Sequence, residues 1–198
     1  IRGDFDTTKQ KKLCIEIMKL LGFDFNAGRL DTSQHPFCGG VRTDIRLTTR
    51  FNNKNFLNSL FGVIHETGHA KYEQNLPSKY ASQPIGRSAS MSIHESQSLF
   101  LEKKIGCSNA FIKRMTPMIR EVFGNKKSFN HENLYNLINH VQPSLIRVEA
   151  DEITYHAHIL IRYELEKDLI SNRLKTCDLP EIWDKKLEVY LGINSNKD

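Results

Sequence analysis

The sequence predicts a mainly α-helical protein with one small β element. Most segments carry apolar residues at helical spacing, whereas one short segment alternates between apolar and polar residues. Neither an internal repeat nor a low-complexity stretch interrupts this pattern. The 198 residues, of which 39% are hydrophobic and 26% charged, are enough to bury a core in one mid-sized domain or in part of a larger one.

The N-terminal part is expected to contain a helix, a turn-rich stretch and a strand. Leu13, Ile17 and Leu20 share one face of a helix expected over about 8–21. Glycines and a proline dominate the stretch that follows. From 41 to 51 apolar and charged residues alternate, which predicts a strand with one apolar face and one charged face.

The rest of the chain predicts helices joined by loops. A long helix is expected over about 54–74, where Phe56 and Ile64 belong to an apolar stripe. A loop with two prolines follows over about 76–86. No linker is evident, so residues 1–198 are expected to form a single region. The further helices are expected over about 88–105, 108–123, 131–141, 149–172 and 180–190.

Composition argues against two classes of partner. No run approaches the roughly 20 apolar residues that span a bilayer, so no membrane partner is expected. Lys and Arg number 28 against 23 Asp and Glu, which gives a net charge of +5. Basic clusters such as Lys9-Gln10-Lys11-Lys12 have no interleaved aromatic residues and are typical of a mixed-sign surface, so no nucleic-acid partner is expected.

The cysteines and the first residues bear on the location of the protein. The four cysteines, at 14, 38, 107 and 177, form no CxxC pair and predict reduced thiols in the cytoplasm. Ile1 opens directly into polar sequence, so no signal peptide is visible. Because Ile1 is not a start methionine, either a leader has been removed or the chain is a piece of a longer one.

The strongest chemical signal is the segment His65-Glu66-Thr67-Gly68-His69 inside the expected long helix. Two histidines four residues apart lie one turn apart on the same helix face, so both imidazoles can reach one Zn²⁺. Glu66 can then reach a water on the open metal position, as general base and proton carrier. The alternative is a pair of partly buried structural histidines.

A catalytic zinc needs a third protein ligand. Tyr72 and Asn75 occupy the Gly and His positions of the extended HExxHxxGxxH pattern, which therefore fails here. Glu73 lies eight residues beyond His65, about 12 Å along the helix axis, which is too far for a shared metal. Glu95 is the leading candidate, because the 26 residues after His69 allow a loop and a return helix.

Two neighbouring patterns allow other interpretations. Glu66-x-x-His69 matches one element of di-iron helical bundles, but no other glutamate has a histidine three residues later. His94 is either an outer partner of a ligand or a plain helix histidine, and the sequence favours neither.

Several motifs together resemble the M32 metallocarboxypeptidases, the thermostable carboxypeptidase Taq family. They occur in the order and spacing of that family and cover nearly the whole chain. In chain order they are Gly28-Arg29-Leu30-Asp31, His35-Pro36-Phe37, Asp44-Ile45-Arg46-Leu47-Thr48, His65-Glu66-Thr67-Gly68-His69, His94-Glu95-Ser96-Gln97 and Ile146-Arg147-Val148-Glu149-Ala150-Asp151.

The resemblance implies a fold, a site and an activity. His65, His69 and Glu95 are expected to bind Zn²⁺, for which Co²⁺ can substitute, with Glu66 as the catalytic base. The family fold is zincin-like and mostly helical, with a small sheet near a long groove, and its members are usually homodimers that remove single residues from peptide C-termini. Family members extend beyond both ends of this chain, so residues 1–198 are expected to be one catalytic region that lacks the N- and C-terminal portions.

An exopeptidase also needs a cation for the free C-terminal carboxylate, and the bidentate arginine fork suits it. Arg147 is the first candidate and Arg46, on the polar face of the expected strand, is the second. The alternative for Arg147 is an ion pair with a nearby carboxylate such as Glu149. His35 either lines the groove or fixes a turn before Pro36.

The sequence therefore favours a zinc-dependent carboxypeptidase that acts on peptides with a free C-terminus. The alternative is a catalytically impaired zinc-binding fragment of such an enzyme, because family members are longer. Release of free C-terminal amino acids by the 198-residue chain separates the two.

Overall fold

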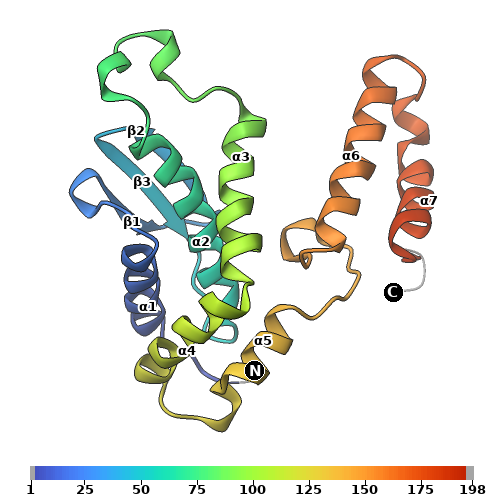
Figure 1. Ribbon diagram of the computed structural model, residues 1–198. Coiled ribbons are helices and arrows are strands. Elements are labelled where there is room, and N and C mark those ends of the chain that lie inside the picture. The colour runs from blue at the N-terminus through green and yellow to red at the C-terminus, as the bar shows by residue number, and fades with distance from the viewer. Residues whose placement is uncertain (1–2, 195–198) are drawn as a thin grey trace. The chain divides into compact units, whose positions relative to one another are not determined.

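The structure is a computed structural model that describes residues 3–194 (Figure 1). It confirms a mainly helical protein with a small sheet. The described residues form two compact units, one up to Tyr135 and one from Asn136. The single catalytic region over 1–198 stays a prediction, and each unit is described by itself.

The first unit combines three strands with most of the helices. The strands are β1 (Gly28–Thr32), β2 (Phe37–Val41) and β3 (Asp44–Thr49). The helices are α1 (Thr7–Leu20), α2 (Phe56–Gln74), α3 (Met91–Leu99), α4 (Asn109–Phe123) and α5 (His131–Ile138), the last of which crosses into the second unit. A π-helix, Phe100–Gly106, continues α3 directly.

The strand predicted over 41–51 has the wrong bounds, because Val41 ends β2 and the strand β3 covers only Asp44–Thr49. The residues form a sheet of order β1-β3-β2, in which β1 is parallel and β2 antiparallel to β3. Val41 pairs with Asp44 across a two-residue turn, which ends β2 and lets β3 begin at Asp44. The alternation itself is correct within β3, where Ile45 and Leu47 are fully buried and Arg46 is exposed.

Helix α2 is the centre of the first unit. It packs on the sheet through β3, on α1 and on α3, as Figure 1 shows. Its buried residues Phe56, Leu60 and Ile64 confirm the apolar stripe expected from the sequence. A helix held on several sides is a rigid platform for side chains that must keep a fixed geometry.

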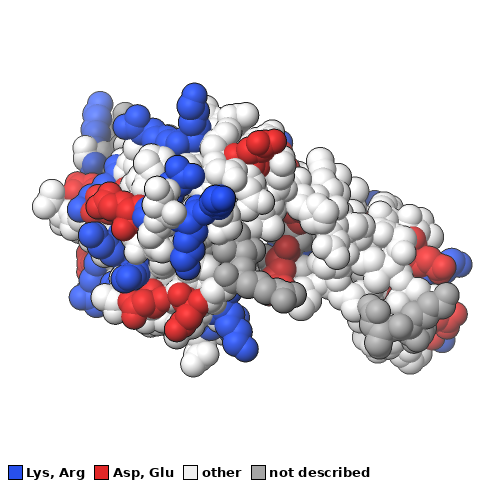
Figure 2. Space-filling view, turned by 90° about the horizontal axis from the view of Figure 1, so that it is seen from below, with Lys and Arg blue, Asp and Glu red and all other residues white. Residues whose placement is uncertain are grey.

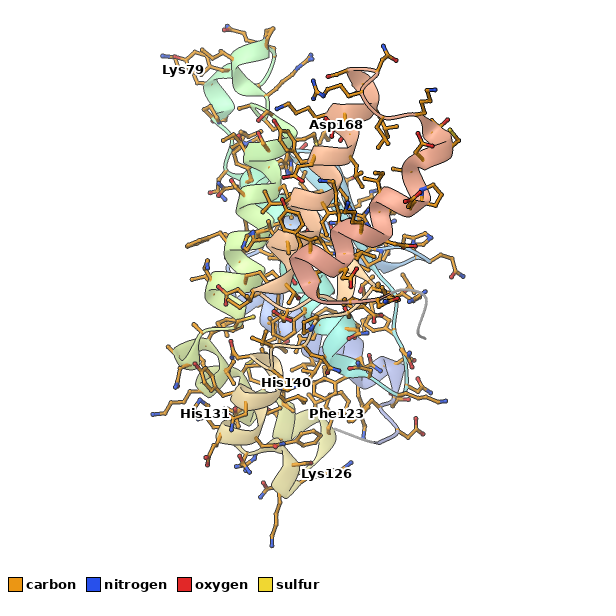
Figure 3. All side chains as sticks on the ribbon, turned by 90° about the vertical axis from the view of Figure 1, so that its right-hand side faces the viewer. Lys79, Phe123, Lys126, His131, His140 and Asp168 are labelled. Atoms are coloured by element: carbon orange, nitrogen blue, oxygen red, sulfur yellow. The ribbon has the colours of Figure 1, made fainter. Side chains whose placement is uncertain are left out.

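An aromatic cluster closes one end of this unit. Phe5, Phe56, Phe123 and Phe129 stack in tilted and edge-on contacts with ring centroids 4.9 to 6.4 Å apart. Phe123 and Lys126 are labelled in Figure 3, and the Lys126 ammonium lies 5.7 Å from the centre of the Phe129 ring. This cluster anchors the start of α2 to the end of α4.

The start of α1 gives a first testable prediction. The Asp6 carboxylate accepts a hydrogen bond from the Lys9 amide at 2.9 Å and caps the helix. Asp6→Ala is expected to lower the free energy of unfolding by about 0.5–2 kcal/mol, because a helix N–H loses its partner. Thermal melts measure the change. Asp4→Ala, a change at an exposed position before the cap, is the control and should have no effect.

The second unit is built on a helix pair, α6 (Thr154–Ile170) and α7 (Leu179–Leu191). The predicted helix over 149–172 begins later than expected, because Asp151 caps it by accepting from the Ile153 and Thr154 amides. The core of this unit consists of Ile161, Leu165, Leu187 and Leu191. Among residues 3–194, no helix is both long and apolar enough to cross a membrane.

Candidate metal centre

Helix α2 places His65 and His69 one turn apart on the side that faces α3. Their ring centres lie 5.0 Å apart, with the rings nearly perpendicular. The helix is well defined around them, because Asn55 caps its start and its interior residues are buried. The i, i+4 spacing of the two histidines therefore has the geometric consequence expected from the sequence.

Gly68 lets α3 approach close enough to complete the cluster. A Cβ atom at Gly68 would lie 2.5 Å from the Cα of Ser98 and 2.6 Å from the carbonyl oxygen of Gln97. Both are backbone atoms of α3, so only glycine fits at this crossing. The close crossing sets the distance between the histidines of α2 and the carboxylate of Glu95 on α3.

The structure brings together the three residues expected to bind metal. Oε2 of Glu95 lies 3.3 Å from Nε2 of His69 and 3.7 Å from Nε2 of His65. One nitrogen or oxygen of each residue lies within 4.8 Å of the others. Glu95 therefore lies next to both histidines, as the length of chain after His69 allows.

Three more residues surround this cluster. Glu102 Oε2 lies 2.8 Å from Nδ1 of His65. His94 lies between two partners, with its Nδ1 2.6 Å from Nδ1 of His69 and its Nε2 2.8 Å from Oε1 of Glu73.

Sequence reasoning missed Glu102 and the actual contact of Glu73. A signal existed for Glu73, which lies one turn after His69, whereas Glu102 lies in the π-helix, where regular helical spacing does not give the direction of a side chain. His94 contacts His69, which is the arrangement that an outer partner of a ligand requires.

The donor set fits a divalent cation. The neighbouring His69 lowers the pKa of the Glu95 carboxyl to about 2, so Glu95 is ionised near neutral pH. Nε2 of His65 and Nε2 of His69 both lie near Oε2 of Glu95, and a ring protonated on Nδ1 has its lone pair on Nε2 to offer to a cation. Two imidazoles and one carboxylate are the protein ligands of many catalytic zinc sites, which keep a further position open.

Glu66 lies beside this cluster and is not engaged elsewhere. Its residue is only 7% exposed, and burial raises the pKa of its carboxyl despite the nearby imidazoles. It makes no hydrogen bond or ion pair with another described residue.

Cys38 on β2 lies near these carboxylates. Burial is the main cause that raises the pKa of its thiol to about 12, and the charges of Glu66 and Glu73 add to it. Strand β2 therefore lies next to the site, and the Cys38 thiol is neutral there.

Each residue expected to bind substrate makes its own contacts. Arg46 is exposed on β3 and pairs with Asp44 at 2.7 Å. The side chain of His35 is exposed, and its carbonyl oxygen accepts from Thr48 Oγ1 at 3.2 Å. Arg147 belongs to the second unit, where its Nη1 donates to the Tyr155 hydroxyl at 2.8 Å.

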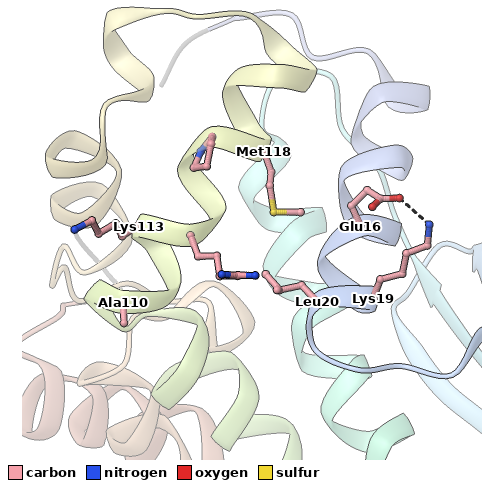
Figure 4. Close-up of a pocket in the computed structure, with 8 residues that line it drawn as sticks. Glu16, Lys19, Leu20, Ala110, Lys113 and Met118 are labelled. Atoms are coloured by element: carbon pink, nitrogen blue, oxygen red, sulfur yellow. Dashed lines mark hydrogen bonds and ion pairs between the residues drawn. The ribbon is translucent and has the colours of Figure 1, made fainter.

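A separate hollow of about 800 Å³ lies between α1 and α4 (Figure 4). It is lined by Lys19 and Leu20 on one side and by Lys113 and Met118 on the other, and none of the metal-centre residues lines it. On the face shown in Figure 2, basic and acidic side chains are interspersed over the surface.

An HExxH helix joined by a carboxylate from a neighbouring helix is the arrangement of a metallopeptidase. The family model described as carboxypeptidase Taq (M32) metallopeptidase matches residues 1–198. The chain belongs to this family, as the sequence motifs indicated.

Curated relatives agree with this membership. The chain is 44% identical over 196 residues to "Carboxypeptidase 1" of Bacillus subtilis. The aligned region covers 98% of this chain and 39% of that protein. It is 43% identical to "Thermostable carboxypeptidase 1" of Thermus thermophilus, over 93% of the chain and 36% of that protein. The chain therefore spans about two fifths of the length of these relatives.

Solved structures show the same fold. Trypanosoma cruzi metallocarboxypeptidase 1 superposes with a TM-score of 0.95 at 44% identity, over 98% of this chain and 41% of that one. The M32 carboxypeptidase of Deinococcus radiodurans superposes with a TM-score of 0.92 at 34% identity, over 97% and 39%. The predicted fold class is therefore confirmed.

Proposed function

We propose that this chain carries the catalytic centre of a metal-dependent carboxypeptidase, with His65, His69 and Glu95 holding Zn²⁺. One observation carries the proposal: three ligand atoms lie within 4.8 Å of one another beside Glu66, a buried carboxylate with no hydrogen-bond or ion-pair partner among residues 3–194. Membership of the M32 family supports it. The His₂Glu set favours zinc among the divalent ions, and Co²⁺ is the expected substitute.

The residues divide the chemistry of peptide hydrolysis between them. When bound, a divalent ion supplies Lewis acidity that polarises the scissile carbonyl and acidifies water. Glu66 takes a proton from the attacking water and delivers it to the leaving amine.

We assign the C-terminal carboxylate of the substrate to Arg147 rather than to Arg46. The Arg46 guanidinium is already engaged by Asp44 through both Nε and Nη2. Arg147 contacts the phenol of Tyr155 and makes no ion pair within residues 3–194, so its charge is free for a carboxylate.

This assignment predicts a change in substrate binding. Arg147→Ala is expected to raise KM for peptides with a free C-terminus by about 10-fold, because a charge-assisted hydrogen bond is lost. Steady-state kinetics measure the effect, and Arg46→Ala is the matched control. A KM that rises only in Arg46→Ala would move the carboxylate site to β3.

The experiment that tests the function combines a metal analysis with a peptide assay. The purified 198-residue chain is expected to bind one Zn²⁺ and to release single amino acids from peptide C-termini, with release stopped by a chelator. Stoichiometric binding without release would favour the impaired zinc-binding fragment, which the two-fifths coverage of the relatives motivates. A chain that binds no Zn²⁺ would contradict both functions.

The homodimer and the cytoplasmic location stay predictions. The location rests on four cysteines, all free of disulfides in the structure, and the dimer rests on the family resemblance. Sedimentation of the purified chain measures the oligomeric state directly.

A further inference from the structure

Each of the two candidate metal-binding imidazoles has a hydrogen-bond partner at Nδ1, and the two partners differ. His65 contacts the carboxylate of Glu102 directly. His69 contacts a second histidine, His94, which in turn contacts the carboxylate of Glu73. We propose that Glu102, and His94 backed by Glu73, are positioning residues that hold His65 and His69 with Nδ1–H outward and Nε2 turned to the metal. This inference rests on the proposed function and adds the residues that prepare its ligands.

The contact of His65 is the simpler of the two. Glu102 Oε2 lies 2.8 Å from Nδ1, and an ionised carboxylate can only accept, so Nδ1 carries the proton. The neutral ring then has its lone pair on Nε2, the atom that faces Glu95 at 3.7 Å. Both side chains of this pair are largely buried, at 20% and 14% exposed, which keeps water from competing for the bond.

The contact of His69 follows from a chain of three residues. The carboxylate of Glu73 accepts from Nε2–H of His94, which leaves Nδ1 of His94 as an acceptor. Nδ1 of His69 lies 2.6 Å from that acceptor and must therefore donate, so its lone pair is on Nε2. Nε2 is the atom that lies 3.3 Å from Glu95. One direction of hydrogen bonding thus fits all three residues.

The helix arrangement makes both contacts specific. Glu73 and His69 belong to α2, and His94 belongs to α3, so the chain of bonds crosses from α2 to α3 and back. The ring of Tyr72 packs edge-on against His94, with ring centres 5.2 Å apart, which restricts the rotation of His94. Glu102 lies in the π-helix, a rare conformation that is frequent at functional sites.

Metal affinity is the first measurement. Outer partners of metal-binding histidines commonly contribute 10–100-fold to affinity. Glu102→Leu and His94→Phe are each expected to weaken Zn²⁺ binding by about 10–100-fold in a chelator competition. Glu102→Gln and His94→Asn keep an acceptor oxygen near the original acceptor atom and are expected to recover part of the loss. The control variants are Glu121→Gln and His140→Phe, at exposed positions (His140 is labelled in Figure 3), and both should bind like the wild type.

A spectroscopic measurement separates positioning from a general structural effect. In the Zn²⁺-loaded wild type, NMR is expected to show two slowly exchanging imidazole protons, assigned to Nδ1–H of His65 and His69. Glu102→Leu should shift or remove the first proton alone, and His94→Phe the second alone. Circular dichroism shows whether each variant is folded, and the wild-type spectrum tests the inference even if a variant is not.

The outcomes distinguish this inference from the proposed function. A wild type that binds Zn²⁺, with Glu102→Leu and His94→Phe within threefold of its affinity, would overturn the positioning role and leave the function standing. Absence of both protected Nδ1–H signals in the Zn²⁺-loaded wild type would overturn it as well. A wild type that binds no Zn²⁺ would remove the proposed function itself.

Discussion

Glu66→Gln is expected to lower the rate of C-terminal residue release by about 10²–10⁴-fold, the usual contribution of a general base. The amide fills the same space, so the buried position of Glu66 and its packing within α2 are kept. It cannot accept a proton from water, and the transfer to the leaving amine is lost with it. Zn²⁺ binding should be unchanged, because Glu66 is not one of the three converging ligands.

The assay compares the wild type and the variant with the same added Zn²⁺, and a metal analysis accompanies each sample. Glu121→Gln, the same chemical change at an exposed position on α4, is the control and should leave the rate unchanged. Peptide release by Glu66→Gln at the wild-type rate would remove Glu66 from the mechanism. Equal loss of Zn²⁺ and activity would instead make Glu66 a structural part of the centre.

The local parts of this site could be predicted because they depend on one helix. His65, Glu66 and His69 lie within five residues, and the 3.6-residue period of a helix fixes their mutual directions. Glu95 was reached by one further step, since the chain between it and His69 is long enough for a loop and a return helix. The structure confirms that Glu95 lies beside both histidines.

The parts that could not be predicted depend on contacts between segments. β1 holds one buried residue, Leu30, and its strand conformation comes from parallel pairing with β3, for which the sequence contains no local signal. The sequence shows that Glu102 and His94 can form hydrogen bonds, but it does not give their partners. Those partners depend on the position of α3 along the axis of α2. The π-helix after Leu99 also changes the direction of Glu102 in a way that regular helical spacing does not describe.

The close contact of α2 and α3 at Gly68 is one of these contacts between segments. A substitution that adds a methyl group at Gly68 tests it. Gly68→Ala is expected to lower the free energy of unfolding by about 1–3 kcal/mol, the cost of overpacking a tight contact. The reason is that the new Cβ would lie 2.5 Å from the Cα of Ser98, a backbone atom that cannot rotate away. The helices must separate, and because Glu95 lies one turn before Ser98 on α3, Zn²⁺ affinity should fall together with stability.

Gly62, in the same helix, is the matched control for this change. A Cβ at Gly62 would meet its nearest neighbours, Thr49 Oγ1 and Pro36 Cγ, at 3.7 and 3.8 Å, which is ordinary contact. Gly62→Ala is therefore expected to stabilise the chain by about 0.4–1 kcal/mol, because alanine restricts the unfolded chain and favours the helix. Thermal melts in the presence of a chelator, and Zn²⁺ competition on the same samples, measure both effects. If Gly68→Ala behaved like Gly62→Ala in both assays, the crossing would not set the position of Glu95, and the close approach of α3 to α2 would have no part in building the metal centre.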